Sequence, residues 1–476
     1  MGYTRTQLWT LLGLQAVVSF SFECIFPFVN QMLLEIGVVN DPKDVGYWSG
    51  LVESTYAVSQ LIAVFPATRI ADTYGRKPVI IWSAVIVGIS MISFGTSTSY
   101  AQMIMSRILG GVEGGSHTCI RVMAAEMSSK ADESHIFTLI GVAYRTGQVL
   151  GQPVGGALAH PERRFPELFD TEFWRKYPYA LPCFVGAAYA LVCAFVGQLV
   201  LKETLRRKKA RKADIRTPSP NSDETAFLLP AETSGSSTPV KKVDSSPSIL
   251  SLLTWPLASL LVSVVAMVLI TEVFFATYPL FAFTPIELGG LGLSEAQIGL
   301  HMATRSLLML LTMLPFSTFS DRFGKLNVYR FSIFGWIPTI LLFPLLNRIA
   351  RAGGEGGILW YAVLAVLFTF WSVTGWAGIS VFLISSDLSP TPEAVATIQG
   401  MLSTAIIAPQ AFAPALGTSA FALAIKHSDI LGGNLFWIGT FTLGALTFLH
   451  SLTLSDSSHD WRGEESNEAR VEEPAI

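Results

Sequence analysis

Two short stretches of the sequence share one pattern and decide the fold: Ala71-Asp72-Thr73-Tyr74-Gly75-Arg76-Lys77-Pro78 and Ser320-Asp321-Arg322-Phe323-Gly324-Lys325. In each, an acid is followed after two residues by a glycine and then a base, between two long apolar segments. Glycine permits a turn with positive φ, the acid can face a helix N-terminus, and the bases can bond helix carbonyl ends. One copy is typical of any solvated turn. Two copies in matching loops indicate a chain built from two related halves.

Apolar windows surround these loops, and each is long enough to cross a bilayer, which takes about 20 residues. The charged content is only 14% and the hydrophobic content 51%. The net charge of -3 argues against nucleic acid as a partner, and the four cysteines form no CxxC pair that would indicate a disulfide framework or a metal site. The sequence therefore predicts an all-α membrane protein with twelve spans near 8–29, 47–68, 79–95, 101–123, 136–159, 178–200, 249–283, 296–319, 328–346, 358–384, 394–424 and 433–454.

Residues 201–248 divide the windows six and six. A basic run from Lys202 precedes a tract rich in Ser, Thr, Pro and Gly, which cannot bury enough apolar surface to fold. The basic run directly after the sixth span favours cytosolic termini. An acidic di-leucine pattern at 224–229 favours vacuolar or endosomal membranes, with the plasma membrane left open. We predict an N-terminal six-helix half at 1–200, a disordered cytosolic linker at 201–248, a C-terminal six-helix half at 249–454 and a disordered acidic tail at 455–476.

The paired loops resemble the signature loop D-x-x-G-R-K/R of the major facilitator superfamily. The matching residues, which we expect to form a gating loop in each half, are Asp72, Gly75, Arg76 and Lys77, then Asp321, Gly324 and Lys325. The second copy departs from the pattern after its lysine. Arg107 with Gly111 is similar to the helix-four motif of the family, which is linked with proton movement. Residues 147–156 resemble the antiporter motif GxxxGPxxGG through Gly147, Gly151, Gly155 and Gly156, with Pro153 one position late.

Three other stretches, residues 22–28, 164–169 and 177–183, resemble the zinc-induced facilitator-like branch of plants and fungi. That branch is linked to proton-coupled export or vacuolar loading of small organic solutes and metal chelates. The resemblance implies no particular substrate, and the sequence offers no cluster of metal ligands for zinc itself.

Ionisable residues within the spans are functional candidates, because a central Arg, Lys or Asp costs at least ~2.5 kcal/mol on insertion scales. Glu23 matches the acid of the branch pattern and is the expected proton-coupling group, assisted by Arg107 and Arg145. A purely structural role stays open for Glu23, as a protonated acid bonded to a neighbouring helix, and for Arg107, as a buried counter-ion that fixes helix packing. Glu53 lies on a polar helix face, which we expect to line the substrate cavity. Glu113 and His117 are four residues apart, and we expect them to pair in a substrate cavity or to pin helices together.

The fifth span carries two stripes. Arg145, Gln148 and Gln152 form a polar stripe expected to line the cavity, where the arginine would suit an anionic or carboxylated substrate. The glycines of the antiporter-like motif form the other stripe and fit close helix approach. In the second half, Glu272 loosely mirrors Glu23, and Arg305 is a further cavity candidate unless the two simply pair. Aromatic residues near the seventh and tenth spans are also cavity candidates or packing residues: Phe274, Phe275, Tyr278, Phe281, Phe283, Trp371 and Trp376.

These observations predict a secondary transporter of the major facilitator fold, acting as a monomer in the bilayer by alternating access. The expected function is proton-coupled antiport that exports a small organic solute or loads a vacuole with it. Symport, uniport, and a nutrient sensor with the same fold that moves no cargo are the alternatives. No cofactor is expected, no phosphate-binding loop favours ATP-driven pumping, and no nucleophile–base arrangement supports an enzyme.

Overall fold

The computed structural model describes residues 5–127, 133–204, 253–388 and 392–454. Helices are the regular elements in these ranges, which contain no strand. The predicted linker, apart from its first four residues, and the predicted acidic tail lie outside the described residues, as does the di-leucine pattern. The fold class predicted from the sequence is confirmed.

The first group of helices, here called the N-terminal bundle, ends at Val200. It consists of α1 (Arg5–Glu23), α2 (Val29–Glu35), η1 (Pro42–Asp44), α3 (Val45–Tyr74), α4 (Arg76–Gly95), α5 (Tyr100–Gly111), η2 (Val112–Gly115), α6 (Ser116–Met127), α7 (Glu133–Leu158), α8 (Pro161–Arg164), α9 (Pro166–Phe169), α10 (Glu172–Lys176) and α11 (Ala180–Val200).

The second group, here called the C-terminal bundle, begins at Trp255. It consists of α13 (Trp255–Phe283), η3 (Ile286–Leu288), α14 (Glu295–Thr312), α15 (Phe316–Phe323), α16 (Lys325–Phe334), α17 (Trp336–Arg351), α18 (Ile358–Thr374), α19 (Trp376–Asp387), α20 (Pro392–Gln410), α21 (Ala413–Lys426), η4 (Ile430–Gly433) and α22 (Leu435–Thr453).

Each of the twelve predicted windows coincides with one helix or with two helices separated by a short break. The breaks fall at prolines and glycines, which interrupt helical hydrogen bonding. Pro27 lies between α1 and α2, and Pro315 lies where α14 and α15 bend by 49°. Among the described residues, seven helical segments are long and apolar enough to span a membrane, or eight with this bent pair, and three of the seven consist of two consecutive helices. Helices α1, α3 and α7, which are less apolar, carry the polar side chains described below.

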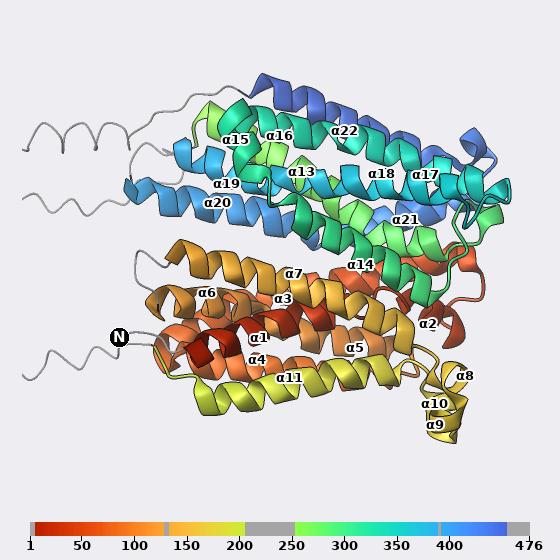
Figure 1. The fold of residues 1–476 in the computed structure, drawn as a ribbon, viewed down its shortest axis with the longest axis horizontal. Coiled ribbons are helices and arrows are strands. Elements are labelled where there is room, and N and C mark those ends of the chain that lie inside the picture. Colours follow the sequence, from red (N-terminus) through yellow and green to blue (C-terminus); the bar gives the residue numbers. More distant parts are fainter. Residues whose placement is uncertain (1–4, 128–132, 205–252, 389–391, 455–476) are drawn as a thin grey trace, which may run out of the picture.

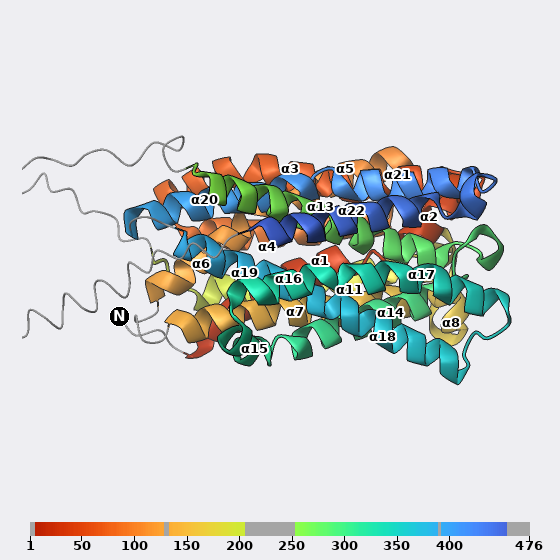
Figure 2. The same ribbon diagram turned by 90° about the horizontal axis from the view of Figure 1, so that it is seen from above.

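The two bundles lie side by side, with their long helices running along the longest axis of the molecule (Figure 1). Figure 2 shows the same alignment from above. We call the end where α11 stops and α13 starts the linker side, and the opposite end, where α7 stops and α14 starts, the far side. Between the bundles, α7 packs on α14 and α3 packs on α21. In Figure 1 the bundles meet where α14 crosses α7 and diverge toward the linker side.

Polar contacts between the bundles lie toward the far side. The Ala415 backbone N–H donates to Ser54 Oγ at 3.2 Å. Lys426 Nζ lies 3.1 Å from Asp44 Oδ1. Arg164 Nη2 lies 3.7 Å from Glu295 Oε2. These contacts join the two bundles at the far side.

The loop between α3 and α4 turns at Gly75, whose φ of 118° is unfavourable for residues with a side chain. The prediction that the acid of this loop faces a helix N-terminus is wrong about which acid does so. Glu203, not Asp72, accepts hydrogen bonds from the backbone N–H groups of Arg76 and Lys77, each at 3.0 Å. Asp72 instead lies 3.3 Å from the Arg76 guanidinium. A residue just after α11 thus caps α4.

The bases of this loop bond helix carbonyls, as expected. Arg76 Nη1 donates to the carbonyl of Ala71 at 3.4 Å, and Lys77 Nζ donates to that of Gln198 near the end of α11 at 2.7 Å. In the second copy Gly324 has a φ of 82°, and Asp321 is exposed. Lys325 Nζ lies 2.6 Å from Asp387 Oδ2 at the end of α19. The first loop is therefore bonded to the end of α11 and the second to the end of α19, each within its own bundle at the linker side.

The glycine stripe of α7 packs against α1 within the N-terminal bundle. A Cβ atom at Gly147, Gly151 or Gly155 would overlap backbone atoms of α1 or of the turn that follows it. Gly156 faces the other bundle instead, against the backbone of Glu295 in α14. Pro153 lies inside α7 without ending it. The motif therefore provides close backbone approach on two sides of one helix.

Candidate functional site

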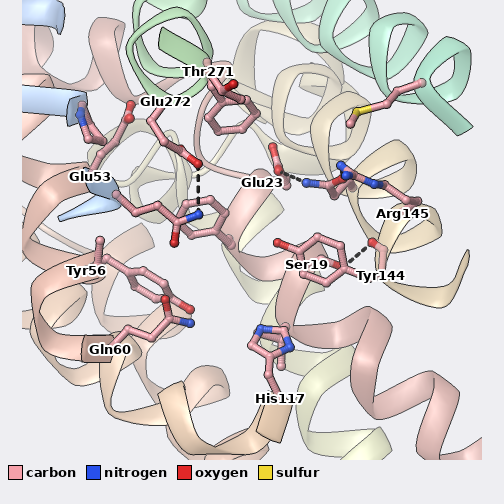
Figure 3. Close-up of a pocket in the computed structure, with 18 of the residues that line it drawn as sticks. Ser19, Glu23, Glu53, Tyr56, Gln60, His117, Tyr144, Arg145, Thr271 and Glu272 are labelled. Carbon is pink, nitrogen blue, oxygen red and sulfur yellow. Dashed lines mark hydrogen bonds between the residues drawn. The ribbon is translucent and has the colours of Figure 1, made fainter. Parts of the chain in front are cut away.

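A cavity of about 280 Å³ lies between the bundles, near the lower end of the roughly 300–1,000 Å³ typical of ligand sites. Helices of both bundles contribute side chains to it (Figure 3). Its charged and amide-bearing lining residues are Glu23, Glu53, Gln60, Arg145, Gln148, Glu272, Arg305 and Gln410, with His117 beside them. Its aromatic lining residues are Phe22, Tyr56, Tyr144, Phe275 and Trp371.

Glu23 is held by two amides from α7. Gln148 Nε2 donates to one carboxylate oxygen at 2.5 Å, and Gln152 Nε2 donates to the other at 2.8 Å. The amides cover the carboxylate so completely that its side chain is 0% exposed, although it forms part of the cavity wall. Ser306 Oγ of α14 donates to Gln152 Oε1 at 3.1 Å. Glu23 is therefore connected through one glutamine to the opposite bundle.

Arg107 lies behind the cavity wall rather than in it. Its guanidinium stacks over Tyr56, 4.4 Å from the ring centroid, and over Phe22, at 5.4 Å. Its Nε donates to the carbonyl of Val52 at 3.4 Å, and its buried Nη2 has no hydrogen-bond partner among the described residues. Cation–π contacts of this kind fix a guanidinium in place.

Arg305 and Arg145 line the cavity. The Arg305 guanidinium lies 4.7 Å from the ring centroid of Trp371 and 5.3 Å from that of Phe275. Arg145 Nη1 donates to Gln148 Oε1 at 2.7 Å. The alternative in which Arg305 pairs with Glu272 is not observed, since no ion pair joins them in the part of the chain described. Glu272 instead accepts a hydrogen bond from Gln410 Nε2 at 3.1 Å.

The expected pair of Glu113 and His117 does not form. A 3-10 segment, η2, interrupts the helix between them, so the four-residue spacing no longer places both side chains together. Tyr56 Oη and Ser116 Oγ donate to Glu113 at 2.8 and 2.6 Å. His117 Nδ1 lies 3.0 Å from Gln15 Nε2 of α1. His117 lines the cavity, while Glu113 lies behind it.

Most of the predicted aromatic residues pack in the C-terminal bundle. Phe275 and Trp371 line the cavity, whereas Tyr278 lies behind it, with its hydroxyl 2.9 Å from His301 Nδ1. Gln152 also lies behind the wall. The sequence prediction missed Phe22, Tyr144 and Gln410 as lining residues. Gln410 ends α20 immediately before its break from α21, and a polar residue at such a break is a signal that could have found it.

An all-helical body with membrane-spanning segments and a polar, partly aromatic cavity between two bundles defines a membrane transporter. The sequence model of the Major Facilitator Superfamily matches residues 11–290. This chain belongs to that superfamily, so it is an integral multi-pass membrane transporter and not an enzyme. The crystal structure of the D-xylose-proton symporter shares the fold, with a TM-score of 0.66 and 15% identity over 94% of this chain and 97% of that one.

Relatives in fungi and plants match nearly the whole chain. The "Major facilitator-type transporter psiT2" of Psilocybe cubensis is 29% identical over 87% of this chain and 83% of its own. The "Efflux pump azaK" of Aspergillus niger is 29% identical over 95% and 88%. The "Protein ZINC INDUCED FACILITATOR-LIKE 1" of Arabidopsis thaliana is 24% identical over 92% and 88%. The resemblance to the zinc-induced facilitator-like branch is therefore confirmed.

Proposed function

We propose that this transporter is a proton-coupled antiporter that exports a small organic solute, or loads an organelle with it, by alternating access. The proposed direction of transport, export, is supported by the relative of this chain that is named an efflux pump in Aspergillus niger. The observation that carries the coupling is the buried Glu23 carboxylate, held by two glutamine amides of α7. The termini and the linker side face the cytosol in this proposal, because the basic run at 202–212 follows α11 directly.

Protonation of Glu23 would change this arrangement in a defined way. An ionised carboxylate accepts at both oxygens, and both glutamine amides donate to it. A protonated carboxyl presents a hydrogen at one oxygen and is a weaker acceptor there, so the hydrogen bond from one amide weakens or that amide turns its oxygen toward the hydrogen. If that amide belongs to Gln152, its bond from Ser306 in the other bundle changes as well. Proton binding would thereby alter the contact between α7 and α14 that must break when the far side opens.

The test is transport in sealed proteoliposomes with an imposed pH gradient, screening organic acids, chelators and amphipathic drugs. Wild-type protein should move a solute against its gradient when protons flow the other way. Glu23→Gln, which keeps an uncharged hydrogen-bonding group in place, should lose gradient-driven accumulation by at least about tenfold while still exchanging solute at equal pH. Glu355→Gln, at an exposed loop acid, is the matched control and should behave as wild type.

Unchanged gradient-driven flux and pH dependence in Glu23→Gln would exclude this residue as the coupling group. Solute and protons moving in the same direction would replace antiport by symport. A protein that binds ligands but moves none of them in either direction would support the sensor interpretation.

A further inference from the structure

Two carboxyl groups from opposite bundles face the same side of the cavity. Glu53 belongs to α3 and Glu272 to α13, and Figure 3 places both across the cavity from Arg145. One oxygen of Glu272 accepts from Gln410. Glu53 is only 5% exposed and lines the cavity, yet it accepts no hydrogen bond from the described residues. A carboxyl group that faces a cavity and receives no hydrogen bond from the protein can accept hydrogen bonds from a bound molecule.

The arginines that line the cavity do not donate to Glu53 or Glu272 among the described residues. Arg145 donates to Gln148, one of the two amides that hold Glu23. Arg305 is stacked on Trp371 and Phe275. The guanidinium of Arg107 is stacked over Tyr56 behind the cavity wall and donates to the backbone carbonyl of Val52, not to Glu53. Glu53 and Glu272 line the same cavity, and their ionised carboxylates carry like charges that repel one another. The lining thus holds three carboxyl and two guanidinium groups, with the acidic excess at Glu53 and Glu272.

The surfaces beside this acidic pair are aromatic. Tyr56 and Phe22 line the cavity from the N-terminal bundle, and Phe275 and Trp371 line it from the C-terminal bundle. Phe22 and Tyr56 lie 5.0 Å apart between ring centroids. Such rings accommodate an apolar body. One face of each ring is already covered by a guanidinium, that of Arg107 in the N-terminal bundle and that of Arg305 in the C-terminal bundle.

We propose that Glu53 and Glu272 together bind the ammonium group of a small amine substrate whose apolar body rests on these aromatic rings. This proposal rests on the transport function proposed above and names its substrate class. An ammonium group has three donors and no acceptor, so it can serve a carboxylate from each bundle at once and remove their repulsion. Because the two acids come from different bundles, a bound amine would also draw the bundles together around itself.

The test is calorimetric titration of the purified full-length protein with three probes of one shape: 2-phenylethylamine, 2-phenylethanol and phenylacetate. Near neutral pH the amine is positively charged, the alcohol is uncharged and phenylacetate is negatively charged. We expect the amine to bind and the other two to bind at least about tenfold more weakly. Glu53→Gln and Glu272→Gln should each weaken amine binding by about tenfold or more, and Glu355→Gln should leave it unchanged.

Three results would overturn the proposal: phenylacetate binding as tightly as the amine, amine binding that survives both cavity substitutions, or no binding of any probe at millimolar concentration. Thermal unfolding of each variant separates lost binding from lost folding. The experiment uses no proton gradient, so its result is independent of coupling. Amine binding without proton-driven movement would overturn the proposed antiport and leave the amine site standing.

Discussion

His160, between α7 and α8, is the residue that gathers the charges of the far side. Its backbone has a φ of 54°, which is rare for a residue with a side chain. Its Nδ1 lies 3.1 Å from Glu162, and its Nε2 lies 3.3 Å from Glu35 and 3.8 Å from Glu295 of the other bundle. The remaining charged or titratable neighbours of this cluster are Tyr179, Arg163 and Arg164. A protonated His160 therefore ties α2, α8 and α14 together.

The stability contributed by His160 should depend on pH. Burial opposes the charged ring, but the Glu35 and Glu162 carboxylates outweigh it and raise the pKa of His160 above 6.5. A raised pKa means that the stabilisation is fully present below 6.5 and is lost as the pH rises through the higher folded-state value. The midpoint of thermal unfolding of wild type should exceed that of His160→Gln most at mildly acidic pH, where the carboxylates are still ionised.

The difference in unfolding midpoint between wild type and His160→Gln should shrink toward alkaline pH. A difference that is constant or grows with pH would show that the neutral ring makes the contact. His427→Gln, at an exposed histidine after α21, serves as the control and should show no such trend.

Among the helices, α7 carries the most demanding packing, because its glycines touch α1. A Cβ at Gly155 would overlap the carbonyl oxygen of Cys24, which belongs to the same bundle and cannot move away when the bundles separate. Overpacking of this kind costs about 1–3 kcal/mol or more. Gly155→Ala should therefore lower the free energy of unfolding by that amount, measured by thermal or denaturant unfolding in detergent.

Gly141 offers a matched control in the same helix. A Cβ there would meet nothing within 4 Å, and alanine in an unstrained helical position is favoured over glycine by roughly 0.5–1 kcal/mol. Gly141→Ala should leave stability unchanged or raise it. Equal effects of the two substitutions would mean that α7 and α1 are not packed as described.

The helices themselves follow from the sequence because their signals are local. Long apolar runs, and prolines and glycines at the breaks, predict every window without knowledge of its neighbours. Within α7 the spacing also places Gln148 and Gln152 on one face. That these amides meet Glu23 of α1, or that Gln410 meets Glu272, depends on which helices pack together, and no local pattern carries that information. The Glu113–His117 prediction is wrong because one 3-10 turn changed the register.

Across the whole molecule, the contacts that close the far side differ in kind from those that hold each bundle together. Ion pairs such as Asp44–Lys426 are partly exposed and worth little, because solvent screens them. Close packing of α3 on α21 is less easily replaced. Gly50 approaches Thr418, Ala415 and Pro414, all of which belong to the other bundle. An added side chain there can be relieved by separating the bundles at the far side, without unfolding either one.

Gly50→Ala should therefore shift the conformational equilibrium toward a state open at the far side. The reporter is the buried Ser54, replaced by cysteine in a Cys193→Ser background, because the other three cysteines are buried. A membrane-impermeant maleimide should label this cysteine about tenfold faster when Gly50 is alanine, which corresponds to a shift of about 1.4 kcal/mol. Gly439→Ala, where a Cβ would meet nothing within 4 Å, should leave the labelling rate unchanged.

The midpoint of thermal unfolding separates this outcome from simple damage. If Gly50→Ala opens the far side, labelling rises while the midpoint falls far less than in Gly155→Ala, because each bundle keeps its own packing. A large loss of stability without faster labelling would mean that the two bundles form one rigid body at this contact, and alternating access would then have to hinge elsewhere. The two glycines thus distinguish packing within a bundle from packing between bundles, which is the distinction that a rocking transporter requires.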